Sequence, residues 1–371
     1  MNSKTKPVDK TFLTIVIILV VLGIAMFFSA SLGVLARSEE TFYAILINQL
    51  VLGLVGGFIL FALALKVPYL FWRKHAFYIF VGSLLIMPLV FIPGLGLSHG
   101  GASRWINLGV VSFQPVEILK IAYIIYLSAW LSWVKQKIED FRFGILPLII
   151  ILTIIAGLLF LQPDTKSFIL MLIAGGCMLF VSGVPMKYFV ALIIAGILAL
   201  GILGFTTPYV KNRIQTFVNP THDVQGSSYQ LQQSLIAFGS GGLFGRGFGQ
   251  SVQKFGYLPE PHGDSIFAVI GEEFGFLGTT VFLVLYVLFA LRGLRIAYRA
   301  PDQFSRLLVA GIVILLTCQA FLNIASLTGL FPLTGVPLVF VSQGGTSLLF
   351  SLFAVGIVLN ISRYQKNQKI V

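Results

Sequence analysis

Long apolar runs separated by short polar segments are the main pattern of this chain. A helix needs about 20 mostly apolar residues to cross the hydrocarbon core of a bilayer. Such runs lie near residues 11–35, 42–65, 75–93, 115–134, 143–161, 167–183, 187–206, 266–291, 307–328 and 340–361. The pattern predicts an all-α polytopic membrane protein with about ten transmembrane helices, forming a single domain over residues 1–371.

The composition agrees with a membrane-spanning chain and excludes an ordinary soluble domain. Hydrophobic residues make up 57% of the 371 residues and charged residues only 10%, whereas a soluble domain has roughly 25% charged residues. A soluble fold leaves much of its surface in water and could not cover this much apolar area. The two cysteines, Cys177 and Cys318, each lie alone in an apolar run, which indicates core packing and not a disulfide or zinc site.

The formal net charge of +12 raises the alternative of a nucleic-acid partner. The distribution of the basic residues favours membrane orientation instead. An even number of spans places both termini on one side; with that side in the cytoplasm, 17 of the 25 lysine and arginine residues lie inside and seven outside, and Lys120 lies within a span. Because basic residues concentrate in cytoplasmic segments, we expect both termini in the cytoplasm and no nucleic-acid partner.

Two outer segments are long enough to carry function. The longer one covers residues 207–265, and within it residues 209–218 have the periodicity of a short amphipathic helix. Such a helix either lies on the outer leaflet or caps the bundle. The shorter segment, residues 94–114, is rich in glycine and carries Arg104. Loops of this composition either let the backbone approach a ligand closely or serve as turns.

Ionisable groups within or beside the spans are candidate functional residues, because each is costly in lipid unless it is paired or faces a polar cavity. Glu117 and Lys120 are three positions apart, so on a helix they form a structural ion pair or line a cavity. Asp164 follows the fifth run, where it caps the next helix or faces an outer cavity. Glu272 and Glu273 are adjacent, so at most one is expected to face a cavity, and pairing with basic groups is the alternative.

Asp264 is the sharpest candidate for chemistry. It lies just outside a span and follows Pro259 and Pro261, which restrict the backbone. A carboxylate at the lipid–water boundary is partly desolvated, which raises its pKa toward the range useful to a general base. A plain surface aspartate is the alternative. Metal binding by His262 with Glu260 or Asp264 is a further alternative, although three residues do not specify a metal site.

Several motifs follow one another over nearly the whole chain. They are residues 101–106 (GASRWI), 114–120 (QPVEILK), 162–164 (QPD), 234–237 (SLIA), 239–245 (GSGGLFG), 250–254 (QSVQK), 259–262 (PEPH), 267–273 (FAVIGEE), 334–338 (TGVPL) and 344–345 (GG). In this order they resemble the SEDS family of FtsW, RodA and SpoVE proteins, and residues 252–262 resemble FtsW more than RodA. The resemblance implies a ten-helix fold and a peptidoglycan glycosyltransferase of the bacterial cytoplasmic membrane. Such an enzyme polymerises lipid II, an undecaprenyl-pyrophosphate-linked disaccharide peptide, at the outer face, for cell division or cell-shape maintenance.

The resemblance also implies roles for individual residues. The family's essential loop aspartate falls on Asp264, which would act as the general base. Arg104, Arg246 and Lys254, or a bound divalent cation such as Mg²⁺ or Mn²⁺, would offset the charge of the leaving pyrophosphate. The residues implied to contact or shape the substrate site are Arg104, Glu117, Lys120, Asp164, Arg246, Lys254 and His262. The implied partners are a class B penicillin-binding protein transpeptidase and other membrane proteins of the division or elongation machinery.

The chain departs from the family pattern at four positions. The usual His-Thr-Asp-Phe has Gly263 and Ser265 around the aspartate here, which affects how the carboxylate is held. The motif at residues 162–164 is usually followed by Leu-Gly-Thr, whereas Lys166 stands in the place of that glycine. Gln343 replaces a usual aromatic residue near the last span. These departures concern fine specificity more than the class of protein.

Two other functions compete with glycosyl transfer. A transporter that flips a lipid-linked sugar would carry charged groups along a path at the membrane midplane, whereas the ionisable residues here cluster outside the spans or at their outer ends. A non-catalytic scaffold that recruits a transpeptidase is the second alternative, and it predicts that Asp264 is dispensable.

Overall fold

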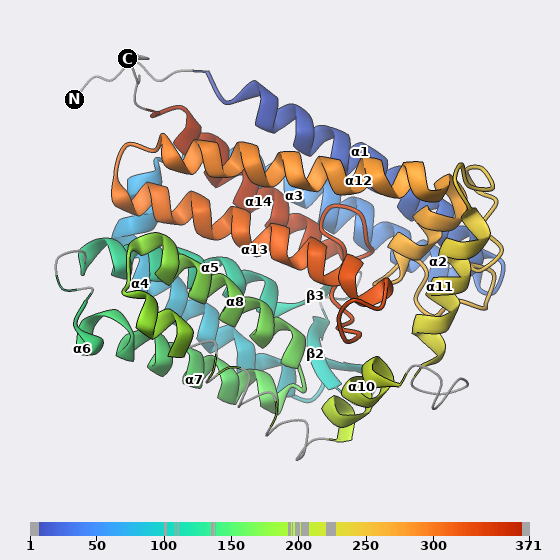
Figure 1. The fold of residues 1–371 in the computed structure, drawn as a ribbon, viewed down its shortest axis with the longest axis horizontal. Helices are drawn as coiled ribbons and strands as arrows, with labels where there is room; N and C mark the ends of the chain where they lie inside the picture. Colours follow the sequence, from blue (N-terminus) through green and yellow to red (C-terminus); the bar gives the residue numbers. More distant parts are fainter. Residues whose placement is uncertain are drawn as a thin grey trace.

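The computed structural model describes residues 7–99, 102–107, 109, 111–134, 137, 139–191, 194, 196, 201, 208–219 and 228–365. In this part of the chain most residues are helical, and long helices lie side by side as a bundle (Figure 1). In chain order the helices are α1 (Lys10–Leu35), α2 (Glu39–Ile47), α3 (Gly57–Lys66), α4 (Tyr69–Ile86), α5 (Pro115–Trp133), α6 (Phe141–Gly144), α7 (Leu146–Leu161), α8 (Thr165–Ser182), α10 (Pro208–Val218), α11 (Tyr229–Gly241), α12 (Ile266–Tyr298), α13 (Gln303–Leu327) and α14 (Gly345–Ser362).

Within the described ranges, nine helical segments are long and apolar enough to cross a membrane. One of them joins α2 to α3 through the π-helical turns of Asn48–Gly56, and another extends α4 by the 3₁₀ turn of Met87–Phe91. These segments confirm the all-α polytopic membrane fold and nine of the predicted spans. The remaining predicted span, residues 187–206, falls mostly on residues outside the described part of the chain.

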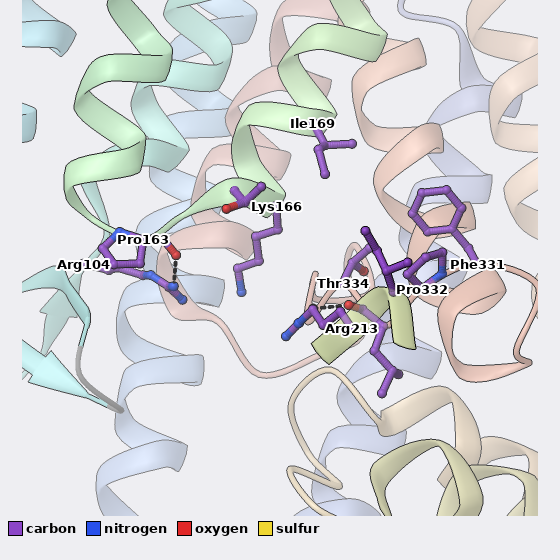
Figure 2. A pocket seen from close by; sticks show the side chains of 11 residues that line it. Arg104, Pro163, Lys166, Ile169, Arg213, Phe331, Pro332 and Thr334 are labelled. Carbon is purple, nitrogen blue, oxygen red and sulfur yellow. Dashed lines mark hydrogen bonds between the residues drawn. The ribbon is translucent and has the colours of Figure 1, made fainter. Parts of the chain in front are cut away.

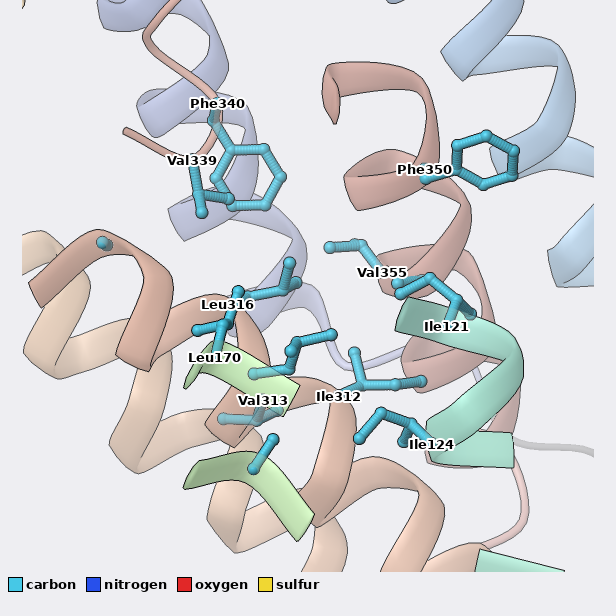
Figure 3. Packing of buried hydrophobic residues seen from close by; sticks show 14 of the residues in the cluster. Ile121, Ile124, Leu170, Ile312, Val313, Leu316, Val339, Phe340, Phe350 and Val355 are labelled. Atoms are coloured by element: carbon cyan, nitrogen blue, oxygen red, sulfur yellow. The ribbon is translucent and has the colours of Figure 1, made fainter. Parts of the chain in front are cut away.

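The core of the bundle lies around α14 and α13. The apolar window of α14 is 89% buried and that of α13 is 72% buried, against 17% for the segment Glu39–Lys66. The helices α14 and α13 are therefore central, whereas the segment Glu39–Lys66 has an apolar surface suited to lipid contact. Figure 3 shows Ile124, Val313 and Val355 among the side chains that fill the space between the central helices.

Both ends of the described chain lie at one end of the bundle. Asp9 caps α1 by accepting a hydrogen bond from the Phe12 N–H, and its own N–H donates to Ser362 Oγ at 3.0 Å. It also forms an ion pair with Arg292, at 2.8 Å, near the C-terminal end of α12. The helix α13 begins at Gln303, just after α12 ends, and runs back to Leu327. Asp264 is hydrogen-bonded through its carbonyl to Asn323 near the far end of α13, so it lies at the opposite end of the bundle from Asp9.

The segment between α4 and α5 forms a small antiparallel sheet. Its strands β1 (Gly96–His99), β2 (Ala102–Asn107) and β3 (Ser112–Phe113) are adjacent in that order. The interpretation of residues 94–114 as a glycine-rich loop of turns was therefore incomplete. The strands are short and rich in small and polar residues, so the two-residue alternation that identifies a strand does not appear.

Two helices lie in the long polar segment before α12. The helix predicted near residues 209–218 is confirmed as α10, whereas α11 was not anticipated. The buried positions of α11 recur at helical spacing, and they are Leu231, Ser234, Ala237 and Gly241. Only one of these four side chains is large and apolar, so the periodicity is hidden in the sequence.

Candidate active site

Asp264 lies where three helices meet. Its Oδ1 accepts a hydrogen bond from Gln230 Nε2 of α11 at 3.0 Å, and its backbone carbonyl accepts one from Asn323 Nδ2 of α13 at 2.6 Å. Asn323 Nδ2 also donates to the carbonyl of Val336 at 2.7 Å, which ties Asp264 to the segment between α13 and α14. The aspartate is therefore held through both its side chain and its backbone.

Gly335 borders the Asp264 carboxylate. Its φ of +67° lies in the left-handed region that favours glycine. A Cβ at this position would lie 3.2 Å from Asp264 Oδ2, 3.4 Å from a guanidinium nitrogen of Arg213 and 3.9 Å from Lys166 Nζ. Lys166 Nζ also donates to the Gly335 carbonyl at 2.5 Å. One carboxylate and two cations therefore surround a glycine that has no side chain to separate them.

A cavity of about 120 Å³ opens beside this group, and three cations line it. Figure 2 shows Arg104, Lys166 and Arg213 on its walls, from β2, α8 and α10 respectively. Arg104 donates to the carbonyls of Gln162 and Pro163, which fixes the position of its guanidinium. The other lining residues are Pro163, Thr165, Ile169, Ile214, Phe331, Pro332, Leu333 and Thr334.

The lining of this cavity suits an anionic group with an apolar portion. Among the described residues that line it, none is acidic. Guanidinium and ammonium groups that face a largely apolar wall bind phosphate oxygens well, because few waters compete for them. The arrangement can therefore hold a phosphate-bearing amphiphile within reach of the Asp264 carboxylate.

The surroundings of Asp264 raise its pKa above the ordinary value of 3.8. Burial is the largest cause, because it disfavours the charged form. Lys166, the hydrogen bond from Gln230 and the guanidinium of Arg213 act in the opposite direction, and Glu260 adds to the rise. The carboxylate thus titrates closer to neutrality than a surface aspartate does, as a general base requires.

Glu117 and Lys120 fit both of their sequence interpretations. They form a buried ion pair with 2.8 Å between Oε2 and Nζ, and Lys120 Nζ also donates to Gln319 Oε1 at 3.0 Å. Together with Lys166 they line a second, inner cavity of about 20 Å³. Lys166 lines both cavities and so connects the pair to the surroundings of Asp264.

Asp164 is the cap of α8. Its Oδ1 accepts from the Ser167 N–H at 3.4 Å, and its Oδ2 accepts from the Ser167 hydroxyl at 2.8 Å. The residue is buried and is not among the residues that line either cavity described above. Its contribution is to begin α8 so that Lys166 projects toward Gly335.

Arg246 and Lys254, which the resemblance assigned to the pyrophosphate, form ion pairs with glutamates and are not among the residues that line this cavity. Lys254 Nζ is 2.8 Å from Glu273 Oε1, with both side chains fully buried, and Arg246 pairs with Glu272 at 3.4 Å. The backbone of Arg246 also donates to the Glu272 carbonyl, so the preceding loop folds back along α12. Pairing of the two adjacent glutamates with basic groups is confirmed. Because the loop folds back, Glu272 and Glu273 each pair with a different cation of the loop. These contacts join residues far apart in the sequence, so sequence spacing does not reveal them.

His262 is buried behind Asp264 and does not complete a metal site. Its Nε2 is 3.8 Å from Glu260 Oε2, and its carbonyl accepts from the Gln343 N–H at 2.8 Å. Burial lowers the pKa of the imidazole, which favours its neutral form near pH 7. Within the described ranges no group of three or more His, Cys, Asp and Glu side chains could hold a metal ion. A divalent cation at Asp264 would therefore find no set of three such side chains in this part of the chain.

Three residues of the site were missed by the sequence interpretation. Gln230 and Asn323 are neutral amides, so the search for ionisable groups passed over them. Arg213 carries a usable signal, because it is a cation on the amphipathic segment that was predicted as a helix. Its proximity to Asp264 depends on how α10 folds over the bundle, and no local pattern reports that.

Comparisons with known sequences agree over nearly the full length. Residues 9–367 match the FtsW, RodA and SpoVE family, described as cell cycle proteins. A protein named probable peptidoglycan glycosyltransferase FtsW, from Geobacter sulfurreducens, is 40% identical over 357 residues, covering 95% of each chain. Stage V sporulation protein E of Bacillus subtilis is 38% identical over 367 residues, covering 98% of this chain and 99% of that protein.

Solved structures give the same architecture. A chain from a structure titled as the coordination of polymerization and crosslinking by a peptidoglycan synthase complex matches with a TM-score of 0.77 and 26% identity, covering 97% of this chain and 99% of that one. The rod shape determining protein RodA of Thermus thermophilus matches with a TM-score of 0.68 and 26% identity, covering 97% and 98%.

Proposed function

Because the chain belongs to the FtsW, RodA and SpoVE family of cell cycle proteins and is a peptidoglycan glycosyltransferase, we propose that it polymerises lipid II at the outer face of the bacterial cytoplasmic membrane. One observation supports this most directly. A partly buried carboxylate, Asp264, borders Gly335 together with two cations, Lys166 and Arg213, that also line a cavity with apolar walls. Lipid II presents a sugar hydroxyl, a pyrophosphate and a polyprenyl chain. The carboxylate suits the hydroxyl, the cations suit the pyrophosphate, and the apolar walls suit the polyprenyl chain.

The proposed reaction uses Asp264 as the general base. The 4-hydroxyl of one lipid-linked disaccharide attacks the anomeric carbon of the growing glycan, and the bond from that carbon to the pyrophosphate oxygen breaks. Asp264 accepts the hydroxyl proton, while polyprenyl pyrophosphate leaves with the bonding electron pair. General-base assistance of this kind contributes roughly 10²–10⁴-fold to rate.

Arg104 and Arg213 are the cations proposed to face the leaving pyrophosphate. Arg104 was already expected in that role, and Arg213 is added because it lines the same cavity, whereas Arg246 and Lys254 are paired with glutamates elsewhere. Fixed positive charges near a leaving group stabilise the charge that develops in the transition state. The side-chain bonds of Arg104 and Arg213 to backbone carbonyls keep both charges in place before substrate arrives.

The orientation proposed for the chain places both termini in the cytoplasm. The first and last described residues lie at one end of the bundle, together with the ion pair between Asp9 and Arg292, and Asp264 lies at the other end. Basic residues concentrate on the side of the termini. The active site then faces outward, where lipid II is used.

The proposed partner is a class B penicillin-binding protein, the transpeptidase that crosslinks the new strands. The structural relative with the TM-score of 0.77 belongs to a peptidoglycan synthase complex, which supports such a pairing. We propose that this chain serves cell division or cell-shape maintenance together with other membrane proteins of the same machinery.

The direct test is glycan synthesis from purified lipid II in vesicles that contain the protein and its transpeptidase partner. We expect lipid-linked glycan chains from the wild-type protein. Translocation of lipid II across the vesicle membrane without polymer would identify a transporter instead. Neither product, with normal recruitment of the transpeptidase, would identify a scaffold.

Gly335→Ala is expected to slow polymerisation by about tenfold or more while the protein stays folded. The added methyl strains a backbone at positive φ and would contact the Asp264 carboxylate, whose displacement weakens proton transfer. Initial rates of glycan synthesis measure the effect. Gly183→Ala is the matched control, since Gly183 also has positive φ but no neighbour within 4 Å of its Cβ position. Equal losses in the two variants would contradict a specific role for Gly335.

A further inference from the structure

The side chain of Lys166 lines both cavities of the site. Its Nζ donates to the Gly335 carbonyl at 2.5 Å. We propose that Lys166 is a positioning residue for the general base, since it fixes the Gly335 segment and holds a positive charge opposite the Asp264 carboxylate. This inference rests on the proposed role of Asp264 as the base.

The charge on Lys166 is close enough to act on Asp264 without touching it. The position of a Cβ on Gly335 is 3.9 Å from Lys166 Nζ and 3.2 Å from Asp264 Oδ2. The two charged atoms are therefore no more than about 7 Å apart, a separation at which opposite charges in a partly dry site still interact appreciably. The interaction favours the ionised carboxylate, which is the form that accepts a proton.

Other groups face Asp264 from each element packed around it. Arg213 of α10 is the second cation, and Glu260 of the preceding loop is an anion that opposes both cations. His262 is held in its neutral form because burial lowers its pKa. The neutral donors from the remaining elements are Gln230 of α11 and Asn323 of α13. Asp164 and Arg104 also act on Lys166, and their charges are of opposite sign.

Burial and Glu260 raise the pKa of Asp264, and Lys166 and Arg213 lower it. Without the Lys166 charge, Arg213 is the one of these two cations that still lowers this pKa. The Asp264 carboxylate would then take up a proton at a higher pH than in the wild-type protein. The effect of Lys166 is then to extend the active range of the enzyme toward lower pH.

The test is the pH profile of the initial rate of glycan synthesis at saturating lipid II. We expect Lys166→Met to move the acid limb upward by about one pH unit, so that the rate on that limb falls about tenfold, with recovery at alkaline pH. Lys166→Arg keeps the charge and should keep the wild-type profile. Lys211→Met is the matched control, because Lys211 is an exposed cation of α10 that lines neither cavity.

Two results would overturn the inference. An unshifted profile in Lys166→Met would show that its charge does not act on Asp264, and an equal loss at every pH would show a packing role only. If Lys166→Met does not fold, as judged by size-exclusion chromatography, the same profile of Lys166→Gln decides the question. Failure of the proposed function would be seen separately, as a wild-type protein without glycan product.

Discussion

Asp264→Asn is expected to reduce lipid II polymerisation by about a hundredfold or more, because an amide cannot accept the proton of the attacking hydroxyl. The substitution preserves the shape of the side chain, and its remaining oxygen can still accept the hydrogen bond from Gln230 Nε2. The backbone contact between Asp264 and Asn323 is also unaffected. The loss would therefore come from proton transfer and not from a displaced loop. Glycan length and amount from purified lipid II measure it.

The same variant is expected to be at least as stable as the wild-type protein. Burial raises the pKa of Asp264 in the folded state, so ionising this carboxyl lowers the free energy of unfolding as pH rises through the raised pKa. At neutral pH the asparagine removes that cost, whereas at pH below both pKa values it makes little difference. Thermal melting in detergent at neutral pH should thus give an unchanged or higher midpoint. If Asp264→Asn made glycan at the wild-type rate, Asp264 would have no role in the mechanism.

The sequence predicted those parts of the site that depend on local spacing. Glu117 and Lys120 are one helical turn apart, so their ion pair follows from the helix alone. Asp164 directly precedes a helix, and its capping role follows in the same way. Asp264 was identified as a carboxylate at a helix end beside the membrane, and family resemblance then gave it a role.

Residues that meet through the tertiary fold could not be predicted in this way. Gln230, Arg213 and Gly335 come from three different elements and reach Asp264 only when α10, α11 and the segment before α14 have packed. Lys254 was assigned to the substrate for the converse reason. The family resemblance assigned this outer-loop cation to the pyrophosphate, yet its partner in the structure, Glu273, lies in a helix that follows the loop.

Lys254→Met is expected to lower the free energy of unfolding by about 3–5 kcal/mol, because it leaves the Glu273 carboxylate buried without its cation. Both side chains are fully buried, and Lys254 Nζ also donates to Ser29 Oγ at 3.0 Å and to the Gly249 carbonyl at 2.8 Å. Ser29 lies on α1, so the lysine joins the first helix, the outer loop and α12. Thermal melting in detergent, together with the yield of monodisperse protein, measures the loss.

A double variant separates the pair from the packing around it. Lys254→Met with Glu273→Met removes both charges, so the buried site no longer holds an uncompensated ion, and stability should recover in part.

Arg104→Ala provides the contrast, because its guanidinium faces the cavity; it should lose activity with a smaller loss of stability. If Lys254→Met instead melted like the wild-type protein and lost only glycan synthesis, the lysine would belong with the pyrophosphate. The buried contacts of its ammonium favour the first outcome, because a group fully enclosed by protein partners has no free face for a substrate.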